Sequence, residues 1–175
     1  MFEFLDGLWF ILPAYVASSF AVLSGGRIVI DFKKKFMGKR ILGDGKTVSG
    51  FVGGVFAGAF IGLIQGAVQD FFKFGIINFS MDFYVGFLIA FGAMTGDLAG
   101  SFIKRRLGIG DGEASFVIDQ MPFIIVALFL ALLAYPPLLG ALGPDGLAFI
   151  LVLTVLLHYL FNLLAHRLRL KKVPW

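Results

Sequence analysis

Apolar residues in this chain form five long runs, and the short segments between them carry nearly all of the charge. The runs cover Leu8–Ile30, Val48–Gln69, Phe83–Ile103, Phe123–Leu142 and Leu147–Leu168. Each is close to the roughly 20 residues that a helix needs to cross a bilayer. Lipid cannot satisfy backbone polar groups, so we expect these runs to be helical. The pattern predicts an all-α integral membrane protein, a bundle of five transmembrane helices forming one domain over residues 1–175.

Composition agrees with this class. The chain is 59% hydrophobic and 15% charged, whereas a soluble domain has about a quarter of its residues charged. It contains no cysteine, which excludes a disulfide framework and a thiolate site. Pro136 and Pro137 are expected to break or shorten the fourth run. Residues Gly143–Gly146 read as a tight turn between the last two runs.

The charges are distributed unevenly between the two ends of the predicted bundle. Cations gather between runs one and two, between runs three and four, and in the tail: Lys33, Lys34, Lys35, Lys39, Arg40, Lys46, Lys104, Arg105, Arg106, Arg167, Arg169, Lys171 and Lys172. The opposite segments hold Lys73 as their single cation. The positive-inside rule then places the N-terminus outside and the C-terminus in the cytoplasm. This topology explains the net charge of +4 without a nucleic-acid partner, and basic loops suit an anionic lipid surface.

The second run has a glycine at every fourth position. These residues are Gly50, Gly54, Gly58, Gly62 and Gly66. Small residues at this spacing let another helix approach closely. The partner helix lies either in the same chain or in a second copy, which would make a homodimer.

The end of the third run carries the first candidate site. Asp97, Ser101, Lys104 and Arg105 fall at i, i+4, i+7 and i+8, and therefore on or near one helical face. An acid within a membrane helix is costly and normally faces the bundle interior or a watery cavity. The alternative is an Asp97–Lys104 pair that only anchors the helix end.

Two further acids, Asp111 and Asp119, follow in the next loop. With Asp97 they form a carboxylate set that suits Mg²⁺ better than Zn²⁺. The alternative is capping, with Asp119 accepting from the first amides of the fourth helix. Their place in a loop rich in cations leaves both interpretations open.

A second candidate element is the loop Gly43-Asp44-Gly45-Lys46-Thr47. It lacks the glycine spacing and the preceding strand of a Walker A motif. A glycine-rich loop next to a helix N-terminus can still hold phosphates through its amides, and an ordinary polar turn is the alternative. On the last run, His158, Asn162 and His166 form a polar stripe that suits interhelical hydrogen bonds or the lining of a polar site.

Together these stretches resemble the CTP-dependent cytidylyltransferases of phospholipid synthesis. Bacterial CDP-diacylglycerol synthases show Gly-Asp, three residues, Ser-x-x-Lys-Arg, then Gly-Ile-Lys-Asp and a later Asp-Arg-x-Asp. The matching residues here are Gly96, Asp97, Ser101, Lys104, Arg105, Gly108, Ile109, Asp111 and Asp119. Gly110 stands in place of the bacterial Lys, and Pro122 in place of the last acid.

The short archaeal branch, the CDP-archaeol synthases, is more similar still. Its Gly-Asp-Gly-Lys-Thr loop, its Ser-Phe-Ile-Lys-Arg-Arg-Leu-Gly-Ile segment, its Asp-Gln pair, its His-x₃-Asn and its terminal Val-Pro-Trp are all present. They occur here as Gly43–Thr47, Ser101–Ile109, Asp119-Gln120, His158 with Asn162, and Val173–Trp175.

The resemblance implies a Mg²⁺-dependent enzyme of the cell membrane that moves CMP from CTP to an archaeal ether-lipid phosphate, at a site facing the cytoplasm. It implies catalytic roles for Asp97, Ser101, Lys104 and Arg105, metal binding by Asp97, Asp111 and Asp119, nucleotide binding by Gly43, Asp44, Gly45, Lys46 and Thr47, and site lining by Arg40, His158 and Asn162.

Three other functions remain open. One is a CDP-diacylglycerol synthase acting on ester-lipid phosphatidic acid. Another is a small transporter in which Asp97 and the His158–Asn162 stripe line a substrate path. The third is a structural membrane protein whose working part is the glycine stripe.

Overall fold

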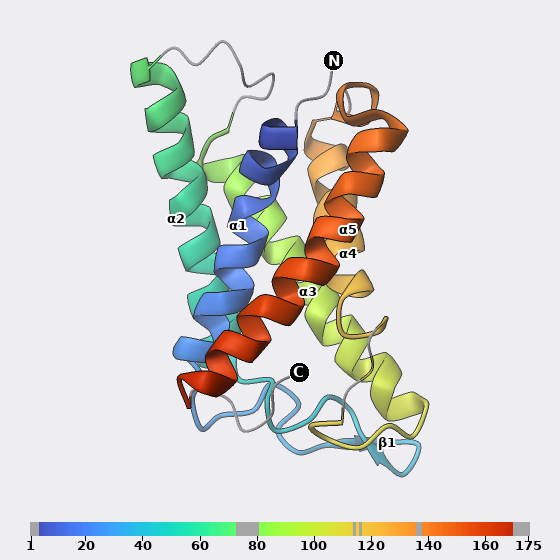
Figure 1. Cartoon of the computed structure of the whole chain (residues 1–175). Helices are drawn as coiled ribbons and strands as arrows, with labels where there is room; N and C mark the ends of the chain where they lie inside the picture. The colour runs from blue at the N-terminus through green and yellow to red at the C-terminus, as the bar shows by residue number, and fades with distance from the viewer. Residues whose placement is uncertain (1–3, 73–80, 114, 116, 136–137, 170–175) are drawn as a thin grey trace.

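In the computed structural model, the described part of the chain forms five helices and one short hairpin (Figure 1). The structure describes residues 4–72, 81–113, 115, 117–135 and 138–169. In chain order the elements are α1 (Phe4–Leu23), β1 (Lys35–Phe36), β2 (Lys39–Arg40), α2 (Val48–Phe72), α3 (Phe83–Arg106), α4 (Met121–Ala134) and α5 (Leu138–Arg167). Within this part of the chain, three helical stretches are long and apolar enough to cross a membrane: Val48–Phe71, Phe83–Arg106 and Leu142–Leu164.

The first helix is shorter than the sequence predicts. Helix α1 ends at Leu23, not at Ile30. The N–H and the hydroxyl of Ser24 both donate to the carbonyl of Phe20, and the flexible pair Gly25-Gly26 follows. Residues 24–30 therefore belong to a loop, and the apolar stretch of α1 is shorter than those of α2 and α3.

The last two runs also differ from their predicted bounds. As expected, α4 stops short of the proline pair, at Ala134. The predicted turn over Gly143–Gly146 is instead a break at one residue. Gly143 has φ 60° and ψ −179°, and the helix resumes with Pro144, whose missing N–H is harmless in a first turn.

Helix α3 lies at the centre of the bundle and packs against α1, α2 and α4. The glycine stripe of α2 forms much of this packing. A Cβ added at Gly58 would lie 2.5 Å from Ala90 Cβ of α3, and one at Gly62 would lie 2.6 Å from the Gly86 Cα. Added Cβ atoms at the other three stripe glycines would also meet atoms of the same chain, at 2.5–2.9 Å. The stripe is thus filled within one chain, and these contacts give no support to a homodimer through it.

A second glycine stripe, on α3, was missed in the sequence. Gly92, Gly96 and Gly100 face α4 and the residues just before it. A Cβ at Gly92 would lie 2.6 Å from the Ala127 Cα, and one at Gly96 would meet the Pro122 carbonyl at 2.2 Å. Backbone contact on both sides therefore fixes the position of α3 between α2 and α4.

Two buried polar contacts fix α1 in the bundle. Pro13 has no N–H, which leaves the carbonyl of Trp9 without its usual helical donor. The buried Gln65 Nε2 of α2 donates to that carbonyl at 2.6 Å. The hydroxyls of Tyr15 and Thr154 are 2.9 Å apart and join α1 to α5.

Candidate active site

A cavity of about 260 Å³ opens at the end of the bundle where two loops cover the helices. We call residues 24–47 loop one and residues 107–120 loop two, and Figure 1 shows both at the lower end of the molecule. Helices α1, α2, α3 and α5 contribute the remaining wall. The sequence-predicted residues that line this pocket are Gly43, Gly45, Lys46, Thr47, Asp97, Ser101, Lys104, Arg105, Asp111, Asp119 and Asn162.

Helix α3 presents its predicted face to the pocket. Asp97, Ser101, Lys104 and Arg105 all line the cavity, as their helical spacing required. Lys104 and Arg105 are buried even though they lie in the last turn of the helix. The charged end of α3 is therefore the floor of a site and not a solvated helix terminus.

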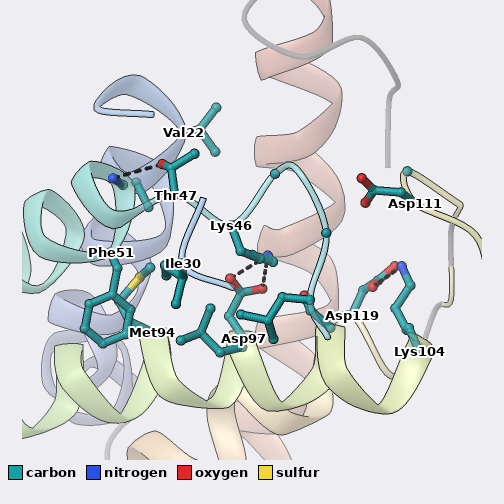
Figure 2. A pocket seen from close by; sticks show the side chains of 18 of the residues that line it. Val22, Ile30, Lys46, Thr47, Phe51, Met94, Asp97, Lys104, Asp111 and Asp119 are labelled. Atoms are coloured by element: carbon teal, nitrogen blue, oxygen red, sulfur yellow. Dashed lines mark hydrogen bonds and ion pairs between the residues drawn. The ribbon is translucent and has the colours of Figure 1, made fainter. Parts of the chain in front are cut away.

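Lys46 of loop one contacts this face of α3 directly. Its Nζ donates to both carboxylate oxygens of Asp97, at 2.7 and 2.6 Å (Figure 2). Both side chains are about 30% exposed or less, so water screens the pair only in part. The predicted alternative of an Asp97–Lys104 anchor is wrong, because Lys104 has a different partner.

That partner is Asp119, at the end of loop two. Lys104 Nζ donates to Asp119 Oδ1 at 2.6 Å and to the carbonyl of Glu113. The second oxygen of Asp119 accepts from the backbone N–H of Ser115 at 2.8 Å. Asp119 does not cap α4, where Gln120 holds the N-cap position without a side-chain bond. The alternative of a capping Asp119 is therefore wrong as well.

Asp111 links loop two to loop one. Its Oδ2 accepts from the Asp44 N–H at 2.9 Å, and its Oδ1 lies 3.9 Å from the Arg105 guanidinium. Gly43, at φ 140°, passes so close that an added Cβ would lie 2.5 Å from Asp111 Oδ1. Asp111 thus bridges the two loops and caps no helix.

Arg105 is the least satisfied charge in the pocket. Its side chain is 8% exposed, and Asp111 is its ion-pair partner at a long 3.9 Å. Among the described residues its buried Nε has no hydrogen-bond partner. A buried guanidinium with spare donors is suited to a phosphate or another anion.

Loop one is organised by a residue that the sequence did not single out. The side chain of Asp31 is fully buried and accepts from the N–H groups of Lys33 and Leu42 and from Arg40 Nε and Nη2, at 3.0–3.1 Å. Burial alone would raise the pKa of Asp31, but the bonds from Arg40, Leu42 and Lys33 outweigh it and lower the pKa to about 2. The same contact to Asp31, and a second to Asp44, raise the pKa of Arg40.

Two residues predicted for the site, Arg40 as a lining residue and Asp44 as a nucleotide-binding residue, have structural contacts outside the pocket. Arg40 is held by Asp31 and by Asp44 at 2.9 Å, and neither Arg40 nor Asp44 lines the cavity. No signal in the sequence marks Asp31 as their organiser, because its donors come from residues 2 to 11 positions away along an irregular loop.

Thr47 serves the start of α2. Its Oγ1 accepts from the N–H groups of Gly26 and Gly50, both at 3.2 Å, which caps the helix and ties the two ends of loop one together. Among the described residues its hydroxyl proton has no acceptor, so the hydroxyl can donate to a ligand. Asn162 reaches the pocket from α5. The side chain of His158 and the Val173–Trp175 motif lie outside the described residues.

The donor set fits Mg²⁺ in chemistry. The acids around the pocket offer oxygen ligands, and Mg²⁺ is usually held by one or two carboxylates together with substrate phosphates. No group of three His, Cys, Asp or Glu side chains close enough to hold an ion occurs among the described residues. A site built on three such side chains is therefore absent from that part of the chain, and a metal held by one or two carboxylates here would need further ligands, such as substrate phosphates.

Known proteins resemble this chain along nearly its whole length. The family model of CarS-like proteins, CDP-archaeol synthase, matches residues 1–175. A CDP-archaeol synthase of Archaeoglobus fulgidus is 46% identical over 98% of this chain and 97% of its own, and that of Pyrococcus furiosus is 42% identical over the whole of both chains. A solved intramembrane enzyme of archaeal membrane lipid biosynthesis superposes with a TM-score of 0.74 at 31% identity, covering 93% of this chain and 96% of its own.

Proposed function

The chain belongs to the CarS-like family of CDP-archaeol synthases, and we propose that its pocket transfers CMP from CTP to the phosphate of an archaeal ether lipid. The observation that carries this proposal is the pocket's division into two parts. Val22, Ile30, Phe51 and Met94 gather at one end, and the charged residues lie toward the other (Figure 2). A lipid phosphate and a nucleotide triphosphate need that combination of surfaces.

In the proposed reaction, a lipid phosphate oxygen attacks the α-phosphorus of CTP. A bond forms between that oxygen and phosphorus, the bond to the β-phosphate oxygen breaks, and pyrophosphate leaves. The lipid phosphate is already an anion near neutral pH, so no strong base is needed. Catalysis is then mainly positioning and charge neutralisation.

The residues divide this work by position. Lys46 and the amides around Gly45 hold the triphosphate from loop one. Arg105 and Lys104 neutralise the lipid phosphate and the leaving pyrophosphate from α3. Ser101, one turn after Asp97, donates a hydrogen bond to one of these groups.

Mg²⁺ is held in this proposal by Asp97 and Asp119 together with the nucleotide phosphates, and Asp111 lies near as a third acid. When bound, the ion neutralises phosphate charge. Lys46 and Lys104 would then contact phosphate oxygens, so that these two lysines and their two carboxylates would each keep an opposite charge beside them.

The finer topology belongs to this proposal as well. We assign five membrane-crossing helices, with α1 and α4 as short spans, the N-terminus outside and the pocket facing the cytoplasm. Support comes from the cations of loops one and two, which lie at one end of the bundle (Figure 1). CTP is a cytoplasmic nucleotide, so this orientation brings the substrate to the pocket.

The direct test is an assay with labelled CTP, Mg²⁺ and either an archaeal ether-lipid phosphate or phosphatidic acid. A labelled CDP-lipid from the ether lipid is the expected product, together with one equivalent of pyrophosphate. Product from phosphatidic acid alone would assign the chain to ester lipids instead. No product from either lipid would overturn the proposed reaction.

A further inference from the structure

Loop one carries an exposed hairpin that takes no part in the pocket. Strands β1 and β2 pair Lys35 with Arg40 and Phe36 with Lys39, which leaves a two-residue turn, Met37-Gly38. Both turn residues have positive φ, 51° and 77°. Such turns favour Asn, Asp or Gly at the first position. Here the position holds a methionine that is 80% exposed.

The hairpin is fixed to the end of α3 by Arg106. Its guanidinium lies over the rings of Phe36 and Phe102, 5.4 and 5.1 Å from their centroids. It also donates to the carbonyls of Phe36, Lys39 and Arg40. In return, Lys39 Nζ donates to the Arg106 carbonyl at 3.3 Å. The hairpin therefore cannot move independently of α3.

This attachment sets the hairpin's depth relative to a membrane. Helix α3 is long and apolar enough to cross a bilayer, and Phe102 and Ile103 are exposed near its charged end. The rings of Phe36 and Phe102 are 6.5 Å apart. The hairpin thus continues the apolar surface of a membrane helix at the level where that helix leaves the lipid.

The chemistry of the hairpin matches a lipid headgroup layer. Lys33, Lys34 and Lys35 are exposed and form no ion pair within the described part of the chain. Asp31, the nearest acid along the chain, already forms an ion pair with Arg40. Cations beside exposed aromatic and apolar side chains are typical of segments that bind anionic membrane surfaces.

We propose that residues 32–39 form a docking surface for anionic lipid, with Met37 at the interface and Lys33, Lys34 and Lys35 on the headgroups. Contact with lipid then explains why methionine occupies a turn position that favours asparagine, because removing the apolar side chain from water is favourable in free energy. The proposal does not depend on the reaction in the pocket. Its consequence is that loop one, which carries Lys46, is held at the membrane surface.

The absence of natural cysteine allows one labelled position at a time. A Met37→Cys variant carrying an environment-sensitive fluorophore would be placed in nanodiscs of phosphatidylcholine alone or with added phosphatidylglycerol. The expected result is a blue-shifted emission, quenched by lipids spin-labelled near the headgroup, and stronger when phosphatidylglycerol is present. The same fluorophore at Asp44→Cys, on an exposed part of loop one beside Asp111, should stay water-like.

The lysines are tested in the same background. Exchange of Lys33, Lys34 and Lys35 for glutamate should abolish the response to phosphatidylglycerol, whereas exchange of all three for arginine should retain it. Water-like emission at position 37 in every nanodisc would overturn the proposal. Quenching of the same strength with and without phosphatidylglycerol would also overturn it. A blue shift that appears only when cell extract is added would indicate a protein partner and would overturn it as well.

Discussion

Asp97 is the residue on which the pocket's charge balance depends. Both of its oxygens accept from Lys46, a residue 51 positions away, so this pair joins loop one to α3 within the pocket, beside the contacts that Arg106 makes outside it. Removing its charge would leave Lys46 unpaired in a partly buried site. In the proposed reaction it would also remove a metal ligand.

We therefore expect Asp97→Asn to lower cytidylyl transfer at least about a hundredfold, the effect typical of losing one electrostatic contact to a transition state. Transfer of labelled CMP to the ether-lipid phosphate measures it. The matched control is Asp145→Asn, an exposed acid of α5 beside the break at Gly143 and outside the pocket lining, which should keep parental activity. Full activity in a folded Asp97→Asn protein would contradict the role.

Asp31 makes the fold of loop one depend on pH. Its pKa is about 2 in the folded protein against an ordinary value of 3.8. A lowered pKa stabilises the folded loop above the ordinary value, here by about 2 kcal/mol, and that contribution is lost as the pH falls through the folded value. Hydrogen exchange at the Leu42 N–H, corrected for the intrinsic rate, should show constant protection down to roughly pH 4 and progressive loss toward pH 2.

An Asp31→Asn variant isolates this effect. Asparagine keeps one acceptor oxygen, for the N–H of either Lys33 or Leu42, puts an NH₂ donor in place of the other oxygen, and gives up the charge that holds Arg40. Protection at Leu42 should be weaker at neutral pH and should no longer change between pH 4 and pH 2. An unchanged acid transition in the variant would assign that transition to another carboxylate.

At the scale of elements, the glycine stripes decide how the helices assemble. Gly62 and Gly86 bring the α2 and α3 backbones into direct contact, with no side chain that could rotate away. The sequence shows the period of such a stripe but not the helix that fills it. Close packing along α2 was therefore predictable from the sequence. Whether the partner helices belong to the same chain or to a second copy was not.

We expect Gly62→Val to destabilise the protein by about 1–3 kcal/mol or more, because its Cβ would lie 2.6 Å from the Gly86 Cα. Ala67→Val is the control, since Ala67 is exposed on the same helix. Thermal unfolding in detergent should show a lower Tm for the first variant and a nearly unchanged Tm for the second. Equal shifts would indicate that valine in α2, and not crowding against α3, is the cause.

Only the part of the site that lies on a regular helix could be predicted from the sequence. Helical periodicity placed Asp97, Ser101, Lys104 and Arg105 on one face because a regular helix fixes that geometry. It could not pair Lys104 with Asp119 or Lys46 with Asp97. Those pairs depend on the paths of two irregular loops, which are set by buried bonds such as those of Asp31 and Asp111. The contacts of Arg106 to the hairpin were missed for the same reason.

At the scale of the whole molecule, hydropathy gave the helices and charge gave their expected orientation. A cysteine-free chain makes the orientation measurable. An impermeant maleimide should label Asp145→Cys in intact cells, and should label Lys35→Cys only after the membrane is opened, because we place loop one in the cytoplasm. Labelling of Lys35→Cys in intact cells would reverse the proposed topology.

Two ion pairs of the pocket, Lys46–Asp97 and Lys104–Asp119, also bear on which ligands the protein does not bind. A cell holds abundant free phosphate, sulfate, potassium and magnesium, and a pocket of unmatched charge would be occupied by them. Here Lys46 is matched by Asp97 and Lys104 by Asp119, so a lone anion or cation must break a pair and leave the other member uncompensated. A ligand that brings both signs meets no such penalty. Single ions therefore exchange poorly with these two pairs, and Arg105, whose Nε has no partner among the described residues, is the cation left for an anionic group of the substrate.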